Sequence, residues 1–375
     1  LVIGNKYMKR KNMGIFAVVL LTLVMLPLAI LNLPQFGKPA KGERLRRIEA
    51  SLQYSQGSFK NISETPSFTS DDNVFTTFWK MFFGRRERLR PEHQLPSTKT
   101  ELSTLPAEQN YLIWMGHSSY FMQLDGKKIL VDPVLSGYAS PFSMLIKAFE
   151  GSSEYTSDDI PEIDYLIITH DHWDHLDMHT IRDIHTRVKQ IYTGLGVGAH
   201  MEHWGVDAAK INEFDWNDSL FLNDGFQLHA TPARHFSGRG LKRNQTLWVS
   251  FVLQTPSLKI FIGGDGGYDR HFTDIGEKFG PFDLVLLEAG QYDKRWKYIH
   301  MHPEEVVQAA SDLKARRLIP IHNSKFALAA HAWDEPLIKI SEQYNQVRPD
   351  YELLTPMIGE QLEILNARTS PWWNP

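Results

Sequence analysis

The run His170–His175, with the sequence His-Asp-His-Trp-Asp-His, constrains this chain more than any other feature. It follows an apolar stretch with the pattern of a buried strand. On an extended backbone alternate side chains point to the same side, so His170 and His172 can bind one ion. Asp174 and His175 lie past the expected bend and can reach a second ion nearby. The alternative is a solvated polar turn. A buried strand that leads directly into these polar residues is costly unless something binds them, so the run predicts a metal site.

Three more polar residues, His235, Asp265 and His322, also stand at the ends of apolar, strand-like stretches. Taken singly, each could be a hydrogen-bonded side chain or a turn residue. Taken together, they supply a third ligand for each of two metals and a carboxylate that bridges them. The chain has 16 His and no Cys, so thiolate ligands are excluded. Imidazole and carboxylate ligands suit two Zn²⁺ ions, with Fe or Mn as alternatives.

Beyond about residue 110, apolar runs alternate with helical patterns. Strands are expected near 111–115, 128–132, 164–169, 226–231, 247–254, 258–263, 283–288 and 317–321, and helices near 177–187, 268–279, 303–315 and 334–345. Several strands come early without helices between them, which favours an α/β fold of two packed sheets with helices outside. The net charge of -4 and the lack of a long basic block argue against a nucleic-acid substrate.

The N-terminal region contains a long apolar run over residues 13–33, without any charged side chain. At about 1.5 Å per residue the run is long enough to cross a hydrocarbon core of about 30 Å. We predict an uncleaved transmembrane anchor over residues 1–33; a cleaved signal peptide and a buried core helix are the alternatives. The basic residues before the run slightly favour a non-cytoplasmic catalytic domain.

Two further segments precede the main domain. Residues 34–70 are rich in Pro, Gly, Ser and charge, and are expected to form a linker with little regular structure. Aromatic residues recur at helical spacing over 72–83, which predicts a helix that either lies on anionic lipid or packs on the main domain. The division is therefore an anchor (1–33), a linker with the aromatic helix (34–105) and a catalytic domain (106–368). The sequence gives no signal for the oligomeric state.

The order H-x-H-x-D-H, followed by a single His, Asp and His, resembles that of the metallo-β-lactamase superfamily. The resemblance covers about residues 105–367 and implies an αββα sandwich. It implies that one metal is bound by His170, His172 and His235, and the other by Asp174, His175 and His322, with Asp265 between them.

Shorter motifs are similar to those of the branch that contains N-acylphosphatidylethanolamine-hydrolysing phospholipase D; they are Trp114–Ser119, Ile129–Pro133, Ala233–Arg239, Thr246–Trp248 and His300–Glu305. The ascorbate-6-phosphate lactonases share the general layout, whereas the apolar run departs from the mammalian phospholipase. The resemblance implies a phosphodiesterase that acts on such lipids through a hydroxide between the metals. A lactonase or sugar-phosphate hydrolase with a soluble substrate is the main alternative, and an inactive membrane scaffold is another.

Catalytic roles follow from the implied ligand set. Asp174 and Asp265 are expected to orient the hydroxide as ligands. We predict that His300 acts in catalysis and contacts the substrate, because it is expected to open a helix. Arg239 follows a ligand in a loop, and Arg suits phosphate, so substrate contact is predicted there too. A helix-start hydrogen bond for His300 and a solvated charge for Arg239 are the alternatives.

His117 and Asp132 lie at the ends of early strands. A metal-bound His needs a partner for its other ring nitrogen, and we predict that these two residues are such partners. Asp132 precedes a proline, so it could equally be a turn residue.

Overall fold

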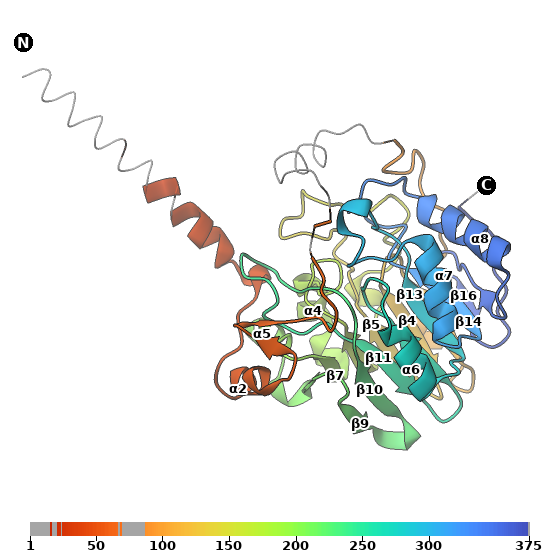
Figure 1. The fold of residues 1–375 in the computed structure, drawn as a ribbon, viewed down its shortest axis with the longest axis horizontal. Coiled ribbons are helices and arrows are strands. Elements are labelled where there is room, and N and C mark those ends of the chain that lie inside the picture. Colours follow the sequence, from red (N-terminus) through yellow and green to blue (C-terminus); the bar gives the residue numbers. More distant parts are fainter. Residues whose placement is uncertain (1–15, 17–20, 24, 67, 70–86, 374–375) are drawn as a thin grey trace, which may run out of the picture.

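The computed structural model describes residues 16, 21–23, 25–66, 68–69 and 87–373 (Figure 1). Two seven-stranded sheets dominate this part of the chain. The first sheet has the order β16 (Gln361–Glu363), β3 (Tyr111–Trp114), β4 (Tyr120–Leu124), β5 (Lys127–Val131), β6 (Ile163–Ile168), β7 (Val188–Gly194) and β8 (Ile211–Phe214). The second has the order β15 (Glu352–Leu353), β14 (Arg317–Ile321), β13 (Leu284–Glu288), β12 (Lys259–Ile262), β11 (Ser250–Gln254), β10 (Gln227–Thr231) and β9 (Ser219–Phe221).

Each sheet changes from antiparallel to parallel pairing partway across. Strands β3, β4 and β5 form an antiparallel meander, and β5 to β8 are parallel. The turn between β4 and β5 is Asp125-Gly126, whose φ angles of 43° and 77° suit a tight hairpin turn of the kind that this dipeptide favours. In the second sheet, β9 to β12 are antiparallel and β12 to β15 are parallel.

The two sheets pack face to face around one apolar core. Buried side chains from both sheets meet in this core, among them Met122 and Ile129 of the first sheet and Leu228 and Phe251 of the second. The outer face of the first sheet packs on α4 (Met178–Ile184) and α5 (Gly198–His203). The outer face of the second packs on α6 (His271–Phe279), α7 (Pro303–Asp312) and α8 (Glu335–Val347) (Figure 1). The expected arrangement of two packed sheets with helices outside is therefore confirmed.

The segment 34–70 differs from the expected linker. It contains α2 (Gly42–Ala50) and a hairpin of β1 (Tyr54–Ser55) and β2 (Ser58–Phe59). On α2, Arg44 forms ion pairs of 2.8 Å with the buried Glu213 and 2.7 Å with Glu202. Phe59 is fully buried in the central core. The prediction of little regular structure in this segment is therefore wrong. Its local composition is typical of a solvated linker, but contacts with residues far away in the sequence hold it in regular elements.

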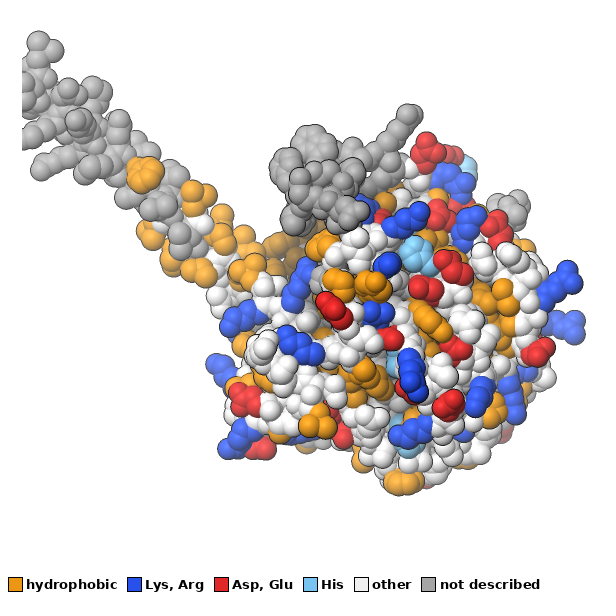
Figure 2. All heavy atoms as spheres, viewed as in Figure 1, with side chains coloured by type: hydrophobic (Ala, Val, Ile, Leu, Met, Phe, Trp, Pro, Cys, Tyr) orange, Lys and Arg blue, Asp and Glu red, His pale blue; other side chains and the backbone are white. Residues whose placement is uncertain are grey.

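Two predictions concern N-terminal residues that the structure describes only in part or not at all. The aromatic helix expected over 72–83 lies outside the described residues. The apolar run 13–33 is described only in part; its described side chains include the exposed Leu21 and Leu23, 62% and 67% accessible. Figure 2 shows hydrophobic side chains along the N-terminal part of the described chain that projects from the body of the molecule. Within the described residues, no helix combines the length and the apolar character that a membrane crossing requires.

Candidate metal centre

The candidate site lies where strands of both sheets end. His170–His175 follows β6, and two backbone N–H groups, those of His175 and Leu176, donate to the carbonyl of His172 at 3.1 and 2.9 Å. These bonds close the turn that separates the first two histidines from Asp174 and His175. Asp177 then caps α4 by accepting a hydrogen bond from the backbone N–H of His179 at 3.0 Å. The second sheet contributes residues after three strands, namely His235 after β10, Asp265 after β12 and His322 after β14.

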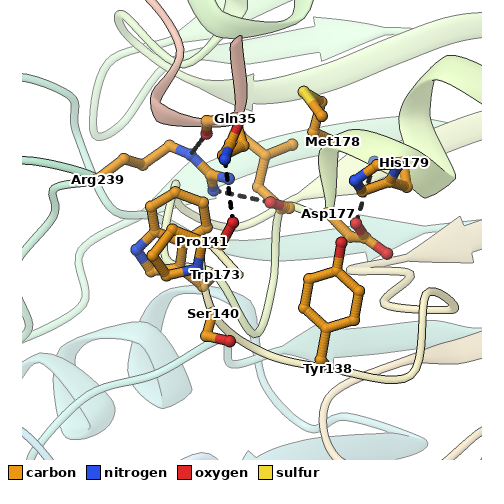
Figure 3. A pocket seen from close by; sticks show the side chains of 10 residues that line it. Gln35, Tyr138, Ser140, Pro141, Trp173, Asp177, Met178, His179 and Arg239 are labelled. Atoms are coloured by element: carbon orange, nitrogen blue, oxygen red, sulfur yellow. Dashed lines mark hydrogen bonds between the residues drawn. The ribbon is translucent and has the colours of Figure 1, made fainter. Parts of the chain in front are cut away.

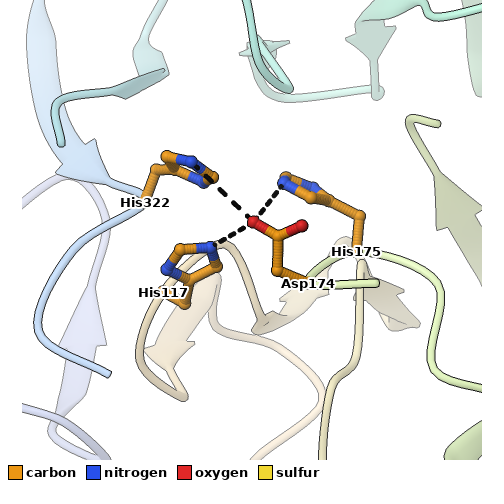
Figure 4. A group of neighbouring side chains, drawn as sticks. All are labelled: His117, Asp174, His175 and His322. Carbon is orange, nitrogen blue, oxygen red and sulfur yellow. Dashed lines mark hydrogen bonds and ion pairs between the residues drawn. The ribbon is translucent and has the colours of Figure 1, made fainter. Parts of the chain in front are cut away.

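The structure brings all the predicted ligand residues together in two groups. The first group is His170, His172, His235 and Asp265, and the second is His117, Asp174, His175 and His322. Within each group, one possible ligand atom per residue lies within 4.8 Å of the others. Figure 4 shows the three histidine rings of the second group around the carboxylate of Asp174.

Asp265 lies between the two groups. Its Oδ2 is 3.2 Å from His175 Nε2, and its Oδ1 is 3.1 Å from His322 Nδ1. On the other side, Oδ2 is 3.9 Å from His170 Nε2 and 3.7 Å from His235 Nε2. A carboxylate in this position could contact two ions at once, and its role as a bridging ligand stays a prediction.

The residues present fit divalent metal ions. Among the described residues, four buried ring nitrogens have no hydrogen-bond partner, namely His117 Nδ1, His172 Nε2, His175 Nε2 and His322 Nε2. Unpaired buried polar atoms are rare in native proteins, and several in one cluster indicate a missing partner. Imidazole nitrogens and carboxylate oxygens are the ligands that Zn²⁺ and similar ions take from proteins.

Electrostatics keep most of these histidines neutral. Burial, with the neighbouring imidazoles, holds the pKa of His170 and His235 well below the usual value, and burial lowers that of His172 to about 4. The neutral ring is the form that binds metal. Burial also acts to lower the pKa of His175, but the carboxylates of Asp265, Asp174 and Asp132 outweigh it and raise the pKa well above its usual value. Burial raises the pKa of Asp265 to about 6.

The two residues predicted as partners of metal-bound histidines both lie in contact with the groups. Asp132 Oδ2 is 2.8 Å from His175 Nδ1, and Asp132 itself accepts hydrogen bonds from the backbone and hydroxyl of Thr169 at 2.8 and 2.6 Å. His117 lies closer to the centre than expected, because its Nε2 is 2.8 Å from Asp174 Oδ2. His117 therefore contacts a candidate ligand carboxylate and belongs to the second group itself.

Arg239 lies away from these groups. The side chain is buried, and its Nη1 donates to the carbonyls of Asp171 and Leu176 at 2.8 and 2.7 Å. Its Nε donates to the carbonyl of Gln35 at 3.0 Å, and its guanidinium lies 3.9 Å from the ring centre of Trp173. Figure 3 shows Arg239 in a separate small pocket beside Gln35 and Trp173. The contacts give it a structural role under the histidine run, in place of the predicted substrate contact.

A cavity of about 240 Å³ opens over the two groups. Its polar floor is formed by His172, Asp174, Asp265, Gln291, His300 and His322, and its apolar wall by Phe68, Phe236, Trp296, Ile299 and Leu328. Arg243 is the one Lys or Arg among the described residues that line it. The Arg243 side chain is exposed and lies 5.1 Å from the ring centre of Phe236. Sequence reasoning missed Arg243, although it shares a loop with His235.

His300 lines the cavity, but it does not open a helix, and its contact with a substrate stays a prediction. Helix α7 begins at Pro303, with His302 as the preceding cap. The ring of His300 is 5.1 Å from that of His235 and 5.2 Å from that of His322, and its Nδ1 is 3.4 Å from Glu288 Oε2.

Glu288 is a buried acid that sequence reasoning missed. It ends β13, its side chain is fully buried, and its Oε1 accepts a hydrogen bond of 2.6 Å from the backbone of Met301. Burial raises the pKa of this carboxyl well above its usual range. The pattern that identified His235, Asp265 and His322, a polar residue at the end of an apolar run, could have identified Glu288 too.

Comparisons with known proteins agree with this architecture. The family model described as "Beta-lactamase superfamily domain" matches residues 127–323. An uncharacterized protein of Mycobacterium tuberculosis is 35% identical over 332 residues, covering 87% of this chain and 88% of that protein. N-acyl-phosphatidylethanolamine-hydrolyzing phospholipase D 1 of Caenorhabditis elegans is 30% identical over 341 residues, covering 83% and 89%. Among solved structures, a metallo hydrolase from Ignicoccus hospitalis gives a TM-score of 0.53 at 19% identity, covering 68% of this chain and 97% of that one, a likeness of fold.

Proposed function

Because this chain belongs to the metallo-β-lactamase superfamily of metal-dependent hydrolases, in a branch with N-acylphosphatidylethanolamine-hydrolysing phospholipase D, we propose that it is a dinuclear phosphodiesterase of phospholipase D type. The proposed substrates are lipids like N-acylphosphatidylethanolamine. The observation that carries the proposal is a floor of two convergent His/Asp groups under a cavity with an apolar wall and one cationic side chain.

Seven residues are proposed as the metal ligands. The first ion would be held by His170, His172 and His235, the second by Asp174, His175 and His322, and both by Asp265. Zn²⁺ is the proposed metal, with Fe or Mn as alternatives. When bound, such a pair of cations supplies a nucleophilic water at neutral pH and neutralises charge that develops on the substrate.

The residues of the chain itself bind and orient the substrate. The apolar side chains Phe236, Trp296 and Leu328 line one side of the cavity, where they exclude water and accept apolar groups of a lipid. Since Nδ1 of His300 faces Glu288, its Nε2 is the nitrogen available to a phosphate oxygen in the cavity. In the reaction, water adds to phosphorus, the bond from phosphorus to the N-acylethanolamine oxygen breaks, and that oxygen takes a proton.

Lipid vesicles provide the direct test of this function. The full chain, loaded with Zn²⁺, is incubated with vesicles that contain N-acylphosphatidylethanolamine, and released N-acylethanolamine and phosphatidic acid are measured. We expect both products, and their loss after treatment with a chelator. Vesicles also present the lipid surface to which the apolar run 13–33 is proposed to tether the chain.

The alternative function is a lactonase or sugar-phosphate hydrolase with a soluble substrate. The cavity of about 240 Å³ favours it in one respect, because this volume lies just below the usual range of ligand pockets and suits a small substrate. A phosphorylated lactone tested beside the vesicles separates the two. Turnover of the lactone with no release of either lipid product would contradict the phospholipase proposal.

Arg243 is proposed to bind the substrate phosphate. A hydrogen bond to a charged group contributes about 1.5–3 kcal/mol, so Arg243→Gln is expected to raise KM for the lipid by about 10-fold or more, with a smaller change in kcat. Lys242→Gln is the matched control, because Lys242 is an exposed neighbour that is not among the residues lining the cavity. Equal KM values for Arg243→Gln and Lys242→Gln would exclude Arg243 from phosphate binding.

A further inference from the structure

The backbone of His235 is held by a residue from the N-terminal segment. His235 lies in an irregular stretch between β10, which ends at Thr231, and β11, which begins at Ser250. Its backbone therefore lies outside the ladder of hydrogen bonds between β10 and β11, yet a buried N–H and C=O need partners. Asn61 provides both: its Oδ1 accepts from the N–H of His235 at 3.1 Å, and its Nδ2 donates to the carbonyl of His235 at 2.7 Å.

Asn61 is itself fixed by neighbouring contacts. Its Oδ1 also accepts a hydrogen bond of 3.0 Å from Nε1 of Trp248, a side chain buried in the central core. Close by in the chain, Phe59 is fully buried in the same core, and its backbone N–H donates to the carbonyl of Asn244 at 2.9 Å. Asn61 is thus held by a hydrogen bond from a core side chain and by a chain neighbour that is buried in the same core.

The ring of His235 is held at a second point. Its Nδ1 donates to the carbonyl of Ile299 at 2.9 Å, which leaves Nε2 as the ligand nitrogen, 3.2 Å from Nδ1 of His172. Asn61 fixes the backbone, and the carbonyl of Ile299 fixes the ring. A ligand held at both ends keeps its nitrogen aimed at the first ligand group.

We propose that Asn61 is a positioning residue for the metal ligand His235, an inference that rests on the proposed function. Asn61 lies outside residues 127–323, which the family model matches. The segment 34–70, which has the composition of a linker, therefore contributes to the metal centre. The side-chain amide of Asn61 pairs with the backbone N–H and C=O of His235, as the backbone of a neighbouring strand would.

The test compares two variants of the full chain that each remove a contact between the same two segments. Asn61→Ala removes the bonds to His235. Gln245→Ala removes the bonds from Gln245 Nε2 to the carbonyls of Gly57 at 2.9 Å and Arg243 at 3.2 Å, neither of which touches His235. Each protein is loaded with Co²⁺, the absorption spectrum of the bound ion is recorded, and release of the ion into a chromophoric chelator is followed. The spectrum and the release report on the metal centre and not on general stability.

Loss of a residue that supports a ligand typically weakens metal binding by about 10- to 100-fold. We expect a loss of that size in Asn61→Ala for one of the two Co²⁺ ions, with a changed spectrum, and wild-type behaviour in Gln245→Ala. Wild-type affinity and spectrum in Asn61→Ala would overturn the positioning role. Wild-type protein that binds no Co²⁺ would instead overturn the proposed function.

Asn61→Asp keeps the inference testable if the alanine variant does not fold. The aspartate retains the oxygen that accepts from His235 and Trp248 and loses only the donor to the carbonyl of His235. That carbonyl then faces a carboxylate oxygen, so metal binding is again expected to weaken. The lost bond, from Asn61 Nδ2 to the carbonyl of His235, is the shorter of the two contacts between these residues. If Asn61→Asp binds Co²⁺ as tightly as the wild type does, this bond does not position His235.

Discussion

Replacing Asp265 by asparagine is expected to lower turnover more than about 100-fold. This loss is larger than the loss that follows from replacing a residue that supports a ligand without binding metal itself. The carboxylate lies within 3.2 Å of His175 Nε2 and 3.7 Å of His235 Nε2, so it faces both ligand groups. Asparagine has the same size but no charge, and two cations close together need an anion between them. The isosteric change is expected to leave the fold intact.

The measurement is product release from lipid vesicles, together with circular dichroism to monitor the fold. Asp274→Asn is the control, because Asp274 is an acid on α6 that pairs with Arg270 at 3.2 Å on the protein surface. Undiminished turnover in Asp265→Asn would remove Asp265 from the shared position between the two metals.

His172→Ala is expected to reduce the bound metal from about two ions to about one per chain and to abolish most turnover. The Nδ1 atom of His172 is 2.9 Å from His170 Nε2 and 3.2 Å from His235 Nε2, and its Nε2 has no hydrogen-bond partner among the described residues. Its loss removes one ligand of the first group and leaves the second group unchanged.

Emission spectroscopy on the desalted protein gives the metal content of this variant. His203→Ala is the matched control, because His203 is an exposed histidine at the end of α5. Metal binding stabilises the folded state, so thermal unfolding of His172→Ala in Zn²⁺ is expected below that of the control. An unchanged metal content in His172→Ala would show that His172 is not a ligand.

The local pattern of the sequence predicted most of the site. His170, Asp265 and His322 each follow an apolar strand, and side chains at the ends of rigid strands are frequent site residues. That these strands belong to two different sheets, β6 to the first and β12 and β14 to the second, comes from the structure. Glu288 was missed by this pattern, because the expected strand 283–288 included it as a strand residue. Strands β7 and β8 were not predicted either, because polar residues interrupt their apolar pattern.

Contacts between distant parts of the chain could not be read from local composition. The segment that contains α2 looks like a linker until Arg44 is seen to pair with the buried Glu213. Asn61 carries no signal in the sequence for its contact with His235.

The choice between two arginines in one loop shows the same limit. Arg239 is close to a ligand in the sequence, but its side chain turns toward Trp173 and backbone carbonyls, whereas Arg243 lines the cavity. Spacing along a loop does not give the direction of its side chains, because an irregular backbone has no fixed period.

The metal content of the wild-type chain shows whether the two ligand groups bind a pair of ions. The full chain is reconstituted with Zn²⁺, desalted, and analysed by emission spectroscopy. The two ligand groups predict about two ions per chain. Less than about a tenth of an ion per chain would contradict the proposed dinuclear site, since the two ligand groups could not supply this chemistry without bound metal.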